Sequence, residues 1–314
     1  MFDVACVGIL TADCIAKTVD KIPEPGKLGL IDSLKLYTGG CAQNAAIDLA
    51  KLGAKVAIVG MVGNDGFGTY MAGELEKNGV NTDGLKVSGD VGSSASVVLI
   101  NSDGERSFIH TTGANAVFSE NDVDMEVIGK SNIVFIAGTM LMPRFDGEEC
   151  ASVLKKCREM GKVTVLDCAW DDTGRWMDVL APCMPYIDYF IPSIDEAEML
   201  AGCTEVEEMA NCFFDRGAKH VVIKLGKDGC YVRESRESKG VVLPTYGKIK
   251  PVDTTGAGDS FCSGFLYGLS KGMDMEASAS LGNAVGTHCI MEIGASTGIK
   301  PYEEIKKFME ENAL

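Results

Sequence analysis

The chain has 314 residues, of which 46% are hydrophobic and 24% are charged, the balance of a globular protein with ample apolar material for a core. It carries 45 Asp and Glu against 29 Lys and Arg, giving a formal net charge of −16. This charge argues against a nucleic-acid partner, because clustered Lys and Arg supply the affinity for nucleic acids.

The 12 cysteines are scattered, often inside apolar runs such as "FDVACVGIL", and none forms a C-x-x-C pair. We therefore expect reduced thiols, with neither a disulfide framework nor a zinc site. The first residues form a strand pattern without the basic segment of a signal peptide, and no apolar run approaches the about 18 residues of a membrane span. These features favour a cytoplasmic protein with no membrane partner.

Short strand patterns alternate with helical patterns along the chain. The strand patterns lie at 3–10, 54–63, 132–138, 162–169, 187–193 and 220–226. The helical patterns lie at 41–53, 67–79, 147–161, 259–272, 276–291 and 302–312, several of them closing on Gly, the usual helix C-cap. Apolar strands separated by capped helices predict an α/β fold: a doubly wound, mainly parallel sheet with helices on both faces. Such sheets bind ligands at the carboxyl ends of their strands.

Two segments, 14–38 and 93–113, carry strand signals and turn residues with no helix between them. The second segment predicts a hairpin with Asn101 to Gly104 at its tip. Long insertions in compact domains are usually functional. We therefore predict a small β lid from these segments, above a core made of 1–13, 39–92 and 114–314. The alternative is two irregular surface excursions.

The stretch "PVDTTGAGDSF", residues 251–261, joins a phosphate cradle to a carboxylate. A glycine-rich turn at a helix start, here Gly256, Ala257 and Gly258, presents backbone N–H groups that suit phosphate. Asp259 follows at once and would repel a resting phosphate. Its position makes sense if a hydroxyl that attacks the phosphate loses its proton there. The alternative is that Asp259 is an ordinary helix N-cap.

Other phosphate and metal motifs are incomplete. Gly129-Lys130-Ser131 resembles the end of a Walker A loop, but Asp124 stands where its first Gly is required. The glycines between Gly63 and Gly68 do not follow the dinucleotide order G-x-G-x-x-G, and no H-E-x-x-H occurs. These absences argue against a dinucleotide-dependent oxidoreductase and against a zinc hydrolase.

The stretch "DTTGAGDSFCSGF" resembles the C-terminal signature of the ribokinase-like (pfkB) carbohydrate kinases, and "GGCAQNAAIDLAKLG", residues 39–53, resembles their N-terminal signature. "GILTADCI", "IHTTGAN" and "IKLGKDGCYV" fit the same family in order and spacing, so the likeness covers essentially the whole chain. The resemblance implies an ATP-dependent sugar kinase. In it, Asp259 is the general base, and the backbone N–H groups of Gly256, Ala257, Gly258 and Asp259 form the anion hole for the transferred phosphate.

The resemblance also assigns the remaining ligand contacts. The sugar residues are Asp13, Gly39, Gly40 and Asn44, which combine polar side chains with close backbone approach. The nucleotide residues are Ser193, Glu196, Lys224, Gly226, Gly229 and Asn283. Glu196 would hold Mg²⁺ through water, and Asp253 and Thr255 match a K⁺ loop of some relatives. Ser193 replaces the family's Asn and Lys224 replaces a common Thr; Lys224 either contacts phosphate or is a strand-end lysine.

The acceptor is less defined than the reaction. Arg106, Arg144 and Lys27 either read an acidic group on a sugar acid or sugar phosphate, or are solvated surface charges. "GTMLMP" lacks the acidic residue that a strict ribose kinase carries there. Ketoses, pentoses and sugar acids stay open as substrates. A nucleoside or sugar-phosphate kinase and a non-catalytic sugar sensor remain alternatives, and the resemblance implies a homodimer through the lid.

Overall fold

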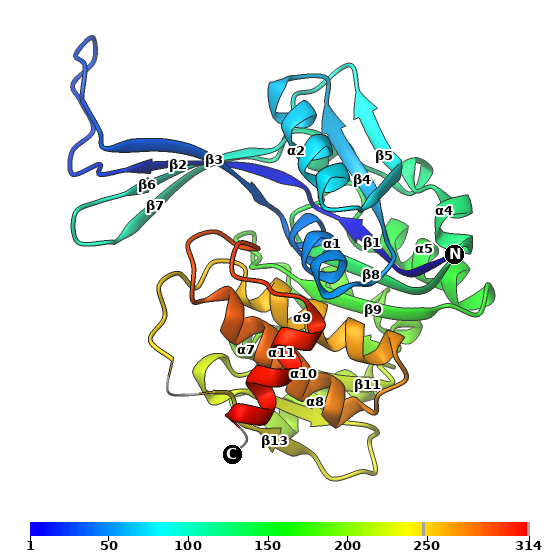
Figure 1. Cartoon of the computed structure of the whole chain (residues 1–314). Helices are drawn as coiled ribbons and strands as arrows, with labels where there is room; N and C mark the ends of the chain where they lie inside the picture. Colours follow the sequence, from blue (N-terminus) through cyan, green and yellow to red (C-terminus); the bar gives the residue numbers. More distant parts are fainter. Residues whose placement is uncertain (247–248, 313–314) are drawn as a thin grey trace.

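The computed structural model describes residues 1–246 and 249–312. Its centre is a nine-stranded sheet in the order β13-β12-β11-β10-β9-β8-β1-β4-β5 (Figure 1). The strands are β1 (Phe2–Gly8), β4 (Val56–Gly63), β5 (Asn81–Ser88), β8 (Ser131–Thr139), β9 (Val163–Cys168), β10 (Tyr189–Phe190), β11 (His220–Lys224), β12 (Cys230–Arg233) and β13 (Val241–Leu243). Strands from β5 to β11 pair in parallel, and β12 and β13 are antiparallel. The predicted mainly parallel α/β fold is confirmed.

Both faces of this sheet are covered by helices, because successive strand residues point to opposite sides. On β1, Ala5 and Val7 pack into one apolar cluster while Val4 and Cys6 pack into the other, and all four are fully buried. The first cluster is covered by α3 (Gly113–Val117), α4 (Met125–Gly129), α5 (Glu148–Glu159), α6 (Met177–Leu180), α7 (Ile194–Ala201) and α8 (Val206–Asp215). The second is covered by α1 (Cys41–Leu52), α2 (Gly66–Lys77), α9 (Ala257–Ser270), α10 (Met275–Cys289) and α11 (Tyr302–Glu311).

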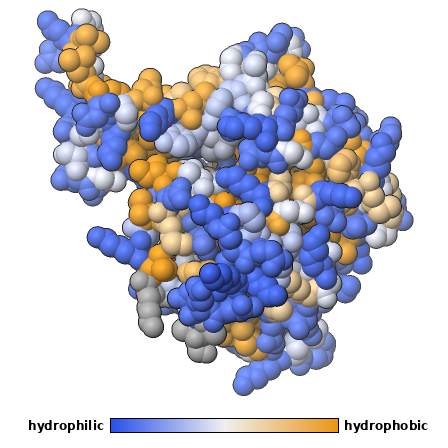
Figure 2. Space-filling model, in the orientation of Figure 1, coloured by the Kyte–Doolittle hydropathy of each residue, from blue (hydrophilic) through white to orange (hydrophobic). Residues whose placement is uncertain are grey.

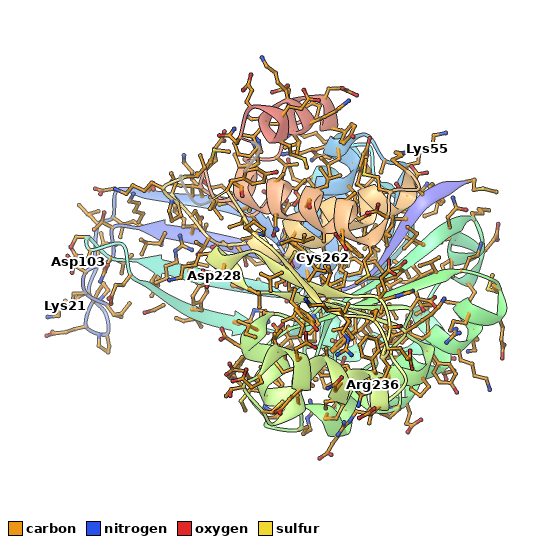
Figure 3. The ribbon with its side chains drawn as sticks, turned by 90° about the horizontal axis from the view of Figure 1, so that it is seen from below. Lys21, Lys55, Asp103, Asp228, Arg236 and Cys262 are labelled. Atoms are coloured by element: carbon orange, nitrogen blue, oxygen red, sulfur yellow. The ribbon has the colours of Figure 1, made fainter. Side chains whose placement is uncertain are left out.

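A second sheet of four strands, in the order β3-β2-β6-β7, projects from one side of the molecule (Figure 1). Its strands are β2 (Thr11–Lys17), β3 (Ser33–Gly39), β6 (Ala95–Ile100) and β7 (Arg106–Thr111). The predicted hairpin is present, and Gly104 N donates to Asn101 O (3.1 Å) at its turn. Apolar surface follows this sheet in Figure 2, and Figure 3 places Lys21 and Asp103 at its outer end. The small sheet begins at Thr11, so Asp13 belongs to it.

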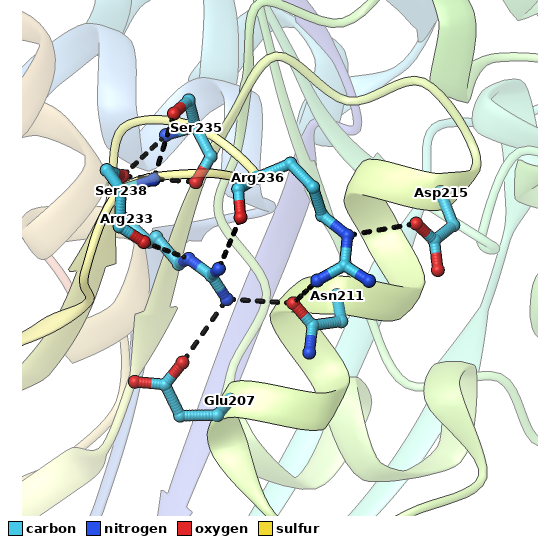
Figure 4. Close-up of polar contacts among 7 residues, drawn as sticks. All are labelled: Glu207, Asn211, Asp215, Arg233, Ser235, Arg236 and Ser238. Carbon is cyan, nitrogen blue, oxygen red and sulfur yellow. Dashed lines mark hydrogen bonds and ion pairs between the residues drawn. The ribbon is translucent and has the colours of Figure 1, made fainter.

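The C-terminal part of the main sheet is tied to α8 by a polar network around Arg233, a buried residue of β12 (Figure 4). The Arg233 guanidinium donates to Glu207 (3.2 Å) and to Asn211 (2.9 Å), both on α8. Arg236 continues the network to Asp215 at the end of the same helix (3.1 Å). Because each Arg contacts several acceptors, the network fixes α8 against the edge of the sheet. Within the described residues, no helix has the length and apolar character to cross a bilayer.

Candidate active site

A cavity of about 630 Å³ opens where the carboxyl ends of the parallel strands meet the start of α9. This is the position at which open α/β sheets bind ligands. All the predicted anion-hole residues line it, as do all the predicted nucleotide residues: Gly256, Ala257, Gly258, Asp259, Ser193, Glu196, Lys224, Gly226, Gly229 and Asn283. Residues from distant parts of the sequence therefore share one concave site.

The first turn of α9 has the geometry of an anion site. Gly256 is its N-cap with φ of +78°, and a Cβ there would lie 2.7 Å from Ala295 Cα, so only glycine fits. Helical bonding begins with Ser260 N donating to Gly256 O (2.8 Å). The N–H groups of Gly258 and Asp259 precede that bond and have no helical acceptor. The N–H of Ala257 donates to Thr254 O (3.2 Å).

Asp259 is a residue of the first turn, and Gly256 takes the N-cap position. The alternative reading of Asp259 as an N-cap is therefore wrong. Burial raises the pKa of the Asp259 carboxyl, and the hydrogen bond from Asn44 works in the opposite direction. Asn44 Nδ2 donates to Asp259 Oδ2 (2.8 Å) across the interface between α1 and α9. The carboxylate is thus partly desolvated and is oriented, two properties that suit a general base.

Lys224 extends from the end of β11 into the same cavity. Its Nζ contacts Asp167 Oδ1 at 2.8 Å, and only 12% of the Lys224 side chain is exposed. Burial alone would lower the pKa of Lys224, but the Asp167 carboxylate raises it well above its usual value. A Cβ on Gly258 would lie 3.5 Å from Lys224 Nζ, so the ammonium stands beside the start of α9. Lys224 is therefore a largely buried cation and not a solvent-exposed surface lysine.

Asp167, at the carboxyl end of β9, is a site residue that our sequence analysis missed. Burial raises its pKa to about 7, against the opposing effect of Lys224. One ligand atom from each of Asp167, Cys168 and Glu196 lies within 4.8 Å of the others. An ionisable residue that closes an otherwise apolar strand, as in "VTVLDC", was the available sequence signal.

Ser193 and Glu196 form a capping box at the start of α7. Ser193 N donates to Glu196 Oε2 (2.7 Å), and Glu196 N donates to Ser193 Oγ (3.3 Å). The Ser that replaces the family's Asn therefore begins the helix and holds the Glu196 carboxylate beside the cavity.

The predicted nucleotide residues Gly226, Gly229 and Asn283 lie along the cavity wall. Gly229 has φ of +95°, and a Cβ there would lie 2.0 Å from Leu243 O, so this turn requires glycine. Asn283 Nδ2 donates to Leu243 O (3.1 Å) and Pro244 O (3.3 Å). The amide of Asn283 thus ties α10 to the chain after β13 while the residue lines the cavity.

The predicted sugar residues lie where the small sheet joins the core. Gly39 packs so closely on Asp13 that a Cβ would lie 2.2 Å from its carboxylate Oδ2, and a Cβ on Gly40 would lie 2.6 Å from Ile9 O. Burial raises the pKa of Asp13, with Ser96 and His110 acting against that effect. Asn44 Oδ1 is buried and has no hydrogen-bond partner within the described residues.

The predicted K⁺ residues, Asp253 and Thr255, are both engaged by Arg106 of the small sheet. Arg106 Nη2 lies 2.8 Å from Asp253 Oδ1, and Arg106 Nη1 donates to Thr255 Oγ1 (2.5 Å). Arg106, for which we had considered recognition of an acidic substrate group, therefore contacts the loop before α9.

Comparison with known proteins identifies the family. The model of the pfkB family carbohydrate kinases matches residues 1–301. The chain belongs to this family. It is accordingly a carbohydrate kinase, a phosphotransferase whose acceptor is an alcohol group.

The kinase is similar in sequence and fold to ribokinases. It is 29% identical to a Bacillus subtilis ribokinase, over 98% of this chain and 100% of that protein. The Thermotoga maritima ribokinase structure superimposes with a TM-score of 0.85 at 25% identity, covering 99% of this kinase and 100% of that chain. A putative ribokinase II of Escherichia coli, solved in complex with ATP and Mg²⁺, shares the fold (TM-score 0.84, 22% identity, 99% of this kinase and 100% of that chain).

Proposed function

We propose that this kinase transfers the γ-phosphate of ATP to a hydroxyl of a small sugar, with Asp259 as the general base. The observation that carries the proposal is the position of the partly buried Asp259 carboxylate, next to the first-turn N–H groups of α9 and bonded to Asn44. A sugar hydroxyl held there could lose its proton to Asp259 as its oxygen attacks the phosphate. Phosphoryl transfer depends mainly on such positioning and on charge stabilisation.

On the acceptor side, we propose that Asp13, Gly39, Gly40 and Asn44 bind the sugar. Asp13 is half-buried and can accept hydrogen bonds from two hydroxyls. Asn44 uses its Nδ2 on Asp259, which leaves Oδ1 to accept from a sugar hydroxyl. Asn44 would then contact the base and the sugar at once, and so align them.

On the phosphate side, we propose that the N–H groups of Gly258 and Asp259 act together with Lys224. Charge that develops on the transferred phosphate is best stabilised by fixed donors in a water-poor site. The Lys224 ammonium is fixed by Asp167 at 2.8 Å and stands beside Gly258. Gly226, Gly229, Ser193 and Asn283 line the part of the cavity that we assign to the nucleotide.

The donor set fits Mg²⁺ at Glu196 and Asp167. Both Asp167 oxygens also accept from Lys224 Nζ (2.8 and 2.9 Å), so the ion would share that carboxylate with the ammonium through water. Mg²⁺ prefers oxygen ligands and usually keeps several waters, which suits two carboxylates at the cavity wall. Cys168 is left out of this set, because a thiol is a soft donor and Mg²⁺ takes oxygen ligands. When bound, the ion would neutralise charge on the phosphates.

A coupled assay of ATP consumption tests the proposal. The purified kinase would be offered ketoses, pentoses, sugar acids, sugar phosphates and nucleosides as separate acceptors, with Mg²⁺ present. We expect one class to be turned over, and the phosphorylated product to be identified by mass spectrometry. ATP consumption that no acceptor stimulates would contradict the proposed function and favour a sugar-binding sensor.

Removal of the Asn44 amide should move the pH dependence of turnover. Asn44 donates to the ionised form of Asp259 and so lowers its pKa; in Asn44→Ala that pKa rises further. Because the ionised carboxylate is the active form, the acid limb of the kcat profile should shift to higher pH, and the KM for sugar should rise. The measurement is kcat and KM against pH, compared between variants.

Ser263→Ala is the matched control for this change. Ser263 Oγ donates to the backbone carbonyl of Asp259 (2.8 Å) and leaves its carboxylate untouched. The acid limb of the kcat profile of Ser263→Ala should therefore coincide with that of the parent protein. If the kcat profile of Asn44→Ala also coincided with that of the parent protein, Asn44 would have no effect on the pKa of the catalytic base, and the prediction would be wrong.

We also propose a homodimer through the outer face of the small sheet. One cross-strand row runs through Leu36, Cys14, Val97 and Ile109, on the face opposite to Asp13. Ile109 is 64% exposed and Val97 is 39% exposed. Adjacent exposed apolar residues of this kind are typical of an interaction surface.

Ile109→Glu should therefore convert the dimer to a monomer, because it would bury a charge in the interface. Light scattering after size exclusion should give twice the chain mass of 33.4 kDa for the parent protein and the single chain mass for the variant. Val242→Glu, at an exposed apolar residue of the edge strand β13, should stay dimeric. A parent protein that is monomeric at micromolar concentration would contradict the proposal.

A further inference from the structure

Arg106 reaches from the small sheet into the loop that precedes the anion site. Arg106 opens β7 and pairs with Ile100, so it lies on the same face as Asp13 and His110. Its guanidinium contacts Asp253 Oδ1 (2.8 Å) and Thr255 Oγ1 (2.5 Å). Thr255 directly precedes Gly256, the N-cap of α9, and Asp253 lies three residues before it.

The partner of Arg106 is a buried anion. Asp253 is 4% exposed and accepts hydrogen bonds from Thr255 N (2.8 Å) and Gly294 N (3.1 Å). Burial alone would raise the pKa of Asp253, but these N–H groups and Arg106 lower it. A buried carboxylate stays ionised where N–H donors and a positive charge surround it, and Asp253 has both. Arg106 supplies the positive charge of this loop.

The small sheet supplies that cation from its own sequence. The resemblance to other family members implies K⁺ at Asp253 and Thr255, but Arg106 contacts Asp253 Oδ1 and Thr255 Oγ1, and Asp253 Oδ2 accepts from Gly294 N. A guanidinium carries the same charge as K⁺ and adds directed N–H donors. The residues present therefore do not fit a K⁺ site in this arrangement.

We propose that Arg106 is a built-in cation that replaces K⁺ and that holds the small sheet against the loop of residues 253–256. Arg106 is in this view a positioning residue: it fixes Asp253 and Thr255, and through them the N-cap Gly256. The kinase would then order its anion site only when the small sheet lies over the core. The expected effects of Arg106 on turnover rest on the proposed function. The expected coupling of the small sheet to residues 253–256 does not.

The first test is the response to monovalent cations at constant ionic strength. Turnover of the parent protein should be the same in K⁺ and in tetramethylammonium. Arg106→Ala in tetramethylammonium should lose about 10²-fold in kcat, the effect of displacing reacting groups by about 1 Å. K⁺, or low concentrations of guanidinium, should restore part of that loss. A parent protein that K⁺ activates, or a variant that neither ion restores, would overturn the proposal.

Two further variants make the rescue specific. In Arg106→Ala/Asp253→Asn the rescue by K⁺ should disappear, because the carboxylate that would hold the ion is gone. Lys86→Ala removes one positive charge from an exposed residue of the edge strand β5 and should behave like the parent protein. If K⁺ still restored turnover in the double variant, the ion would act at a site other than Asp253, and the proposed replacement of K⁺ by Arg106 would be wrong.

The second test needs no substrate and no activity. Hydrogen exchange of the protein alone should show faster exchange in Arg106→Ala than in the parent, at β7 and at residues 253–259 together. Exchange that is unchanged at both segments would overturn the coupling. If no acceptor were found in the screen above but both segments loosened together, the proposed substrate would be wrong and the coupling by Arg106 would stand.

Discussion

Asp259→Asn is expected to lower kcat by about 10²–10⁴, the usual contribution of general-base catalysis, while sugar binding is retained. The amide has the shape of the carboxylate but cannot take the proton of the acceptor hydroxyl. Because burial raises the pKa of Asp259 in the folded protein, its ionised form costs stability as pH rises above the unfolded pKa. The neutral amide that replaces the carboxylate removes that cost, so the variant should be at least as stable as the parent near pH 8.

The measurement pairs single-turnover phosphate transfer with thermal unfolding. Asp274→Ala is the matched control, since Asp274 is the N-cap of α10 and its side chain accepts from Ala277 N. Loss of such a cap should cost about 1 kcal/mol of stability and leave kcat unchanged. Asp259→Asn should therefore lose turnover and keep its stability, whereas Asp274→Ala should lose stability and keep its turnover. Asp259→Asn with nearly full turnover would remove Asp259 from the mechanism.

The regular elements around the main sheet could be predicted because the spacing of their apolar residues and the residues at their ends indicate the same structure. In α1, small apolar residues at helical spacing end at Gly53, which takes the left-handed C-cap that glycine favours. The strand expected at 187–193 is shorter, and only Tyr189–Phe190 is paired as β10. Pro192 lacks an N–H for the ladder, and the capping box at Ser193 starts α7 immediately afterwards.

Helix α7 itself carried a readable signal that our sequence analysis passed over. Ser193 and Glu196 have the Ser-x-x-Glu spacing of a capping box, which predicts a helix start as well as a nucleotide contact. We predicted only the second role. The family motif and the helix cap are here the same pair of side chains, so one does not exclude the other.

The turn at residues 256–259 could be predicted because its N–H donors and its carboxylate all come from consecutive residues. The contacts of Arg106 with Asp253 and of Lys224 with Asp167 could not, because each joins segments that only the folded chain brings together. Arg106 in particular could be recognised as basic, but its partner depends on how the small sheet lies over the core. From the sequence alone, Arg106 could be interpreted either as a residue that recognises an acidic substrate or as a solvated surface charge.

The interface between α1 and α9 joins the two signatures physically. Asn44 on α1 donates to Asp259 on α9, and one turn further along α1 Asp48 Oδ2 accepts from Ser260 Oγ (2.6 Å). Asp48 is fully buried, and burial raises its pKa to about 7. Two polar contacts at adjacent turns fix the rotation of α1 relative to α9 more closely than apolar packing alone would. The amide of Asn44 is thereby held on the proposed base.

Gly258→Ala is expected to fold normally and to lose about 10²–10³ in kcat, the loss seen when a donor of an oxyanion-type site no longer reaches its group. Outside the backbone of α9 itself, the nearest heavy atom to the added methyl would be Lys224 Nζ, at an ordinary contact distance of 3.5 Å. The methyl would nevertheless project between Lys224 and the first turn of α9, where we place the transferred phosphate. It should therefore displace the phosphate while sugar affinity is preserved.

Gly256→Ala supplies the contrast from the same turn. Gly256 has φ of +78°, and its Cβ would lie 2.5 to 2.8 Å from atoms of Ala295, so this variant should lose stability, by about 1–3 kcal/mol from backbone strain alone. Thermal unfolding, sugar titration and kcat measured on both variants separate the two effects. A Gly258→Ala protein with parental turnover would move the phosphate away from this turn. One that lost sugar affinity as strongly as turnover would place the sugar, and not the phosphate, at the start of α9.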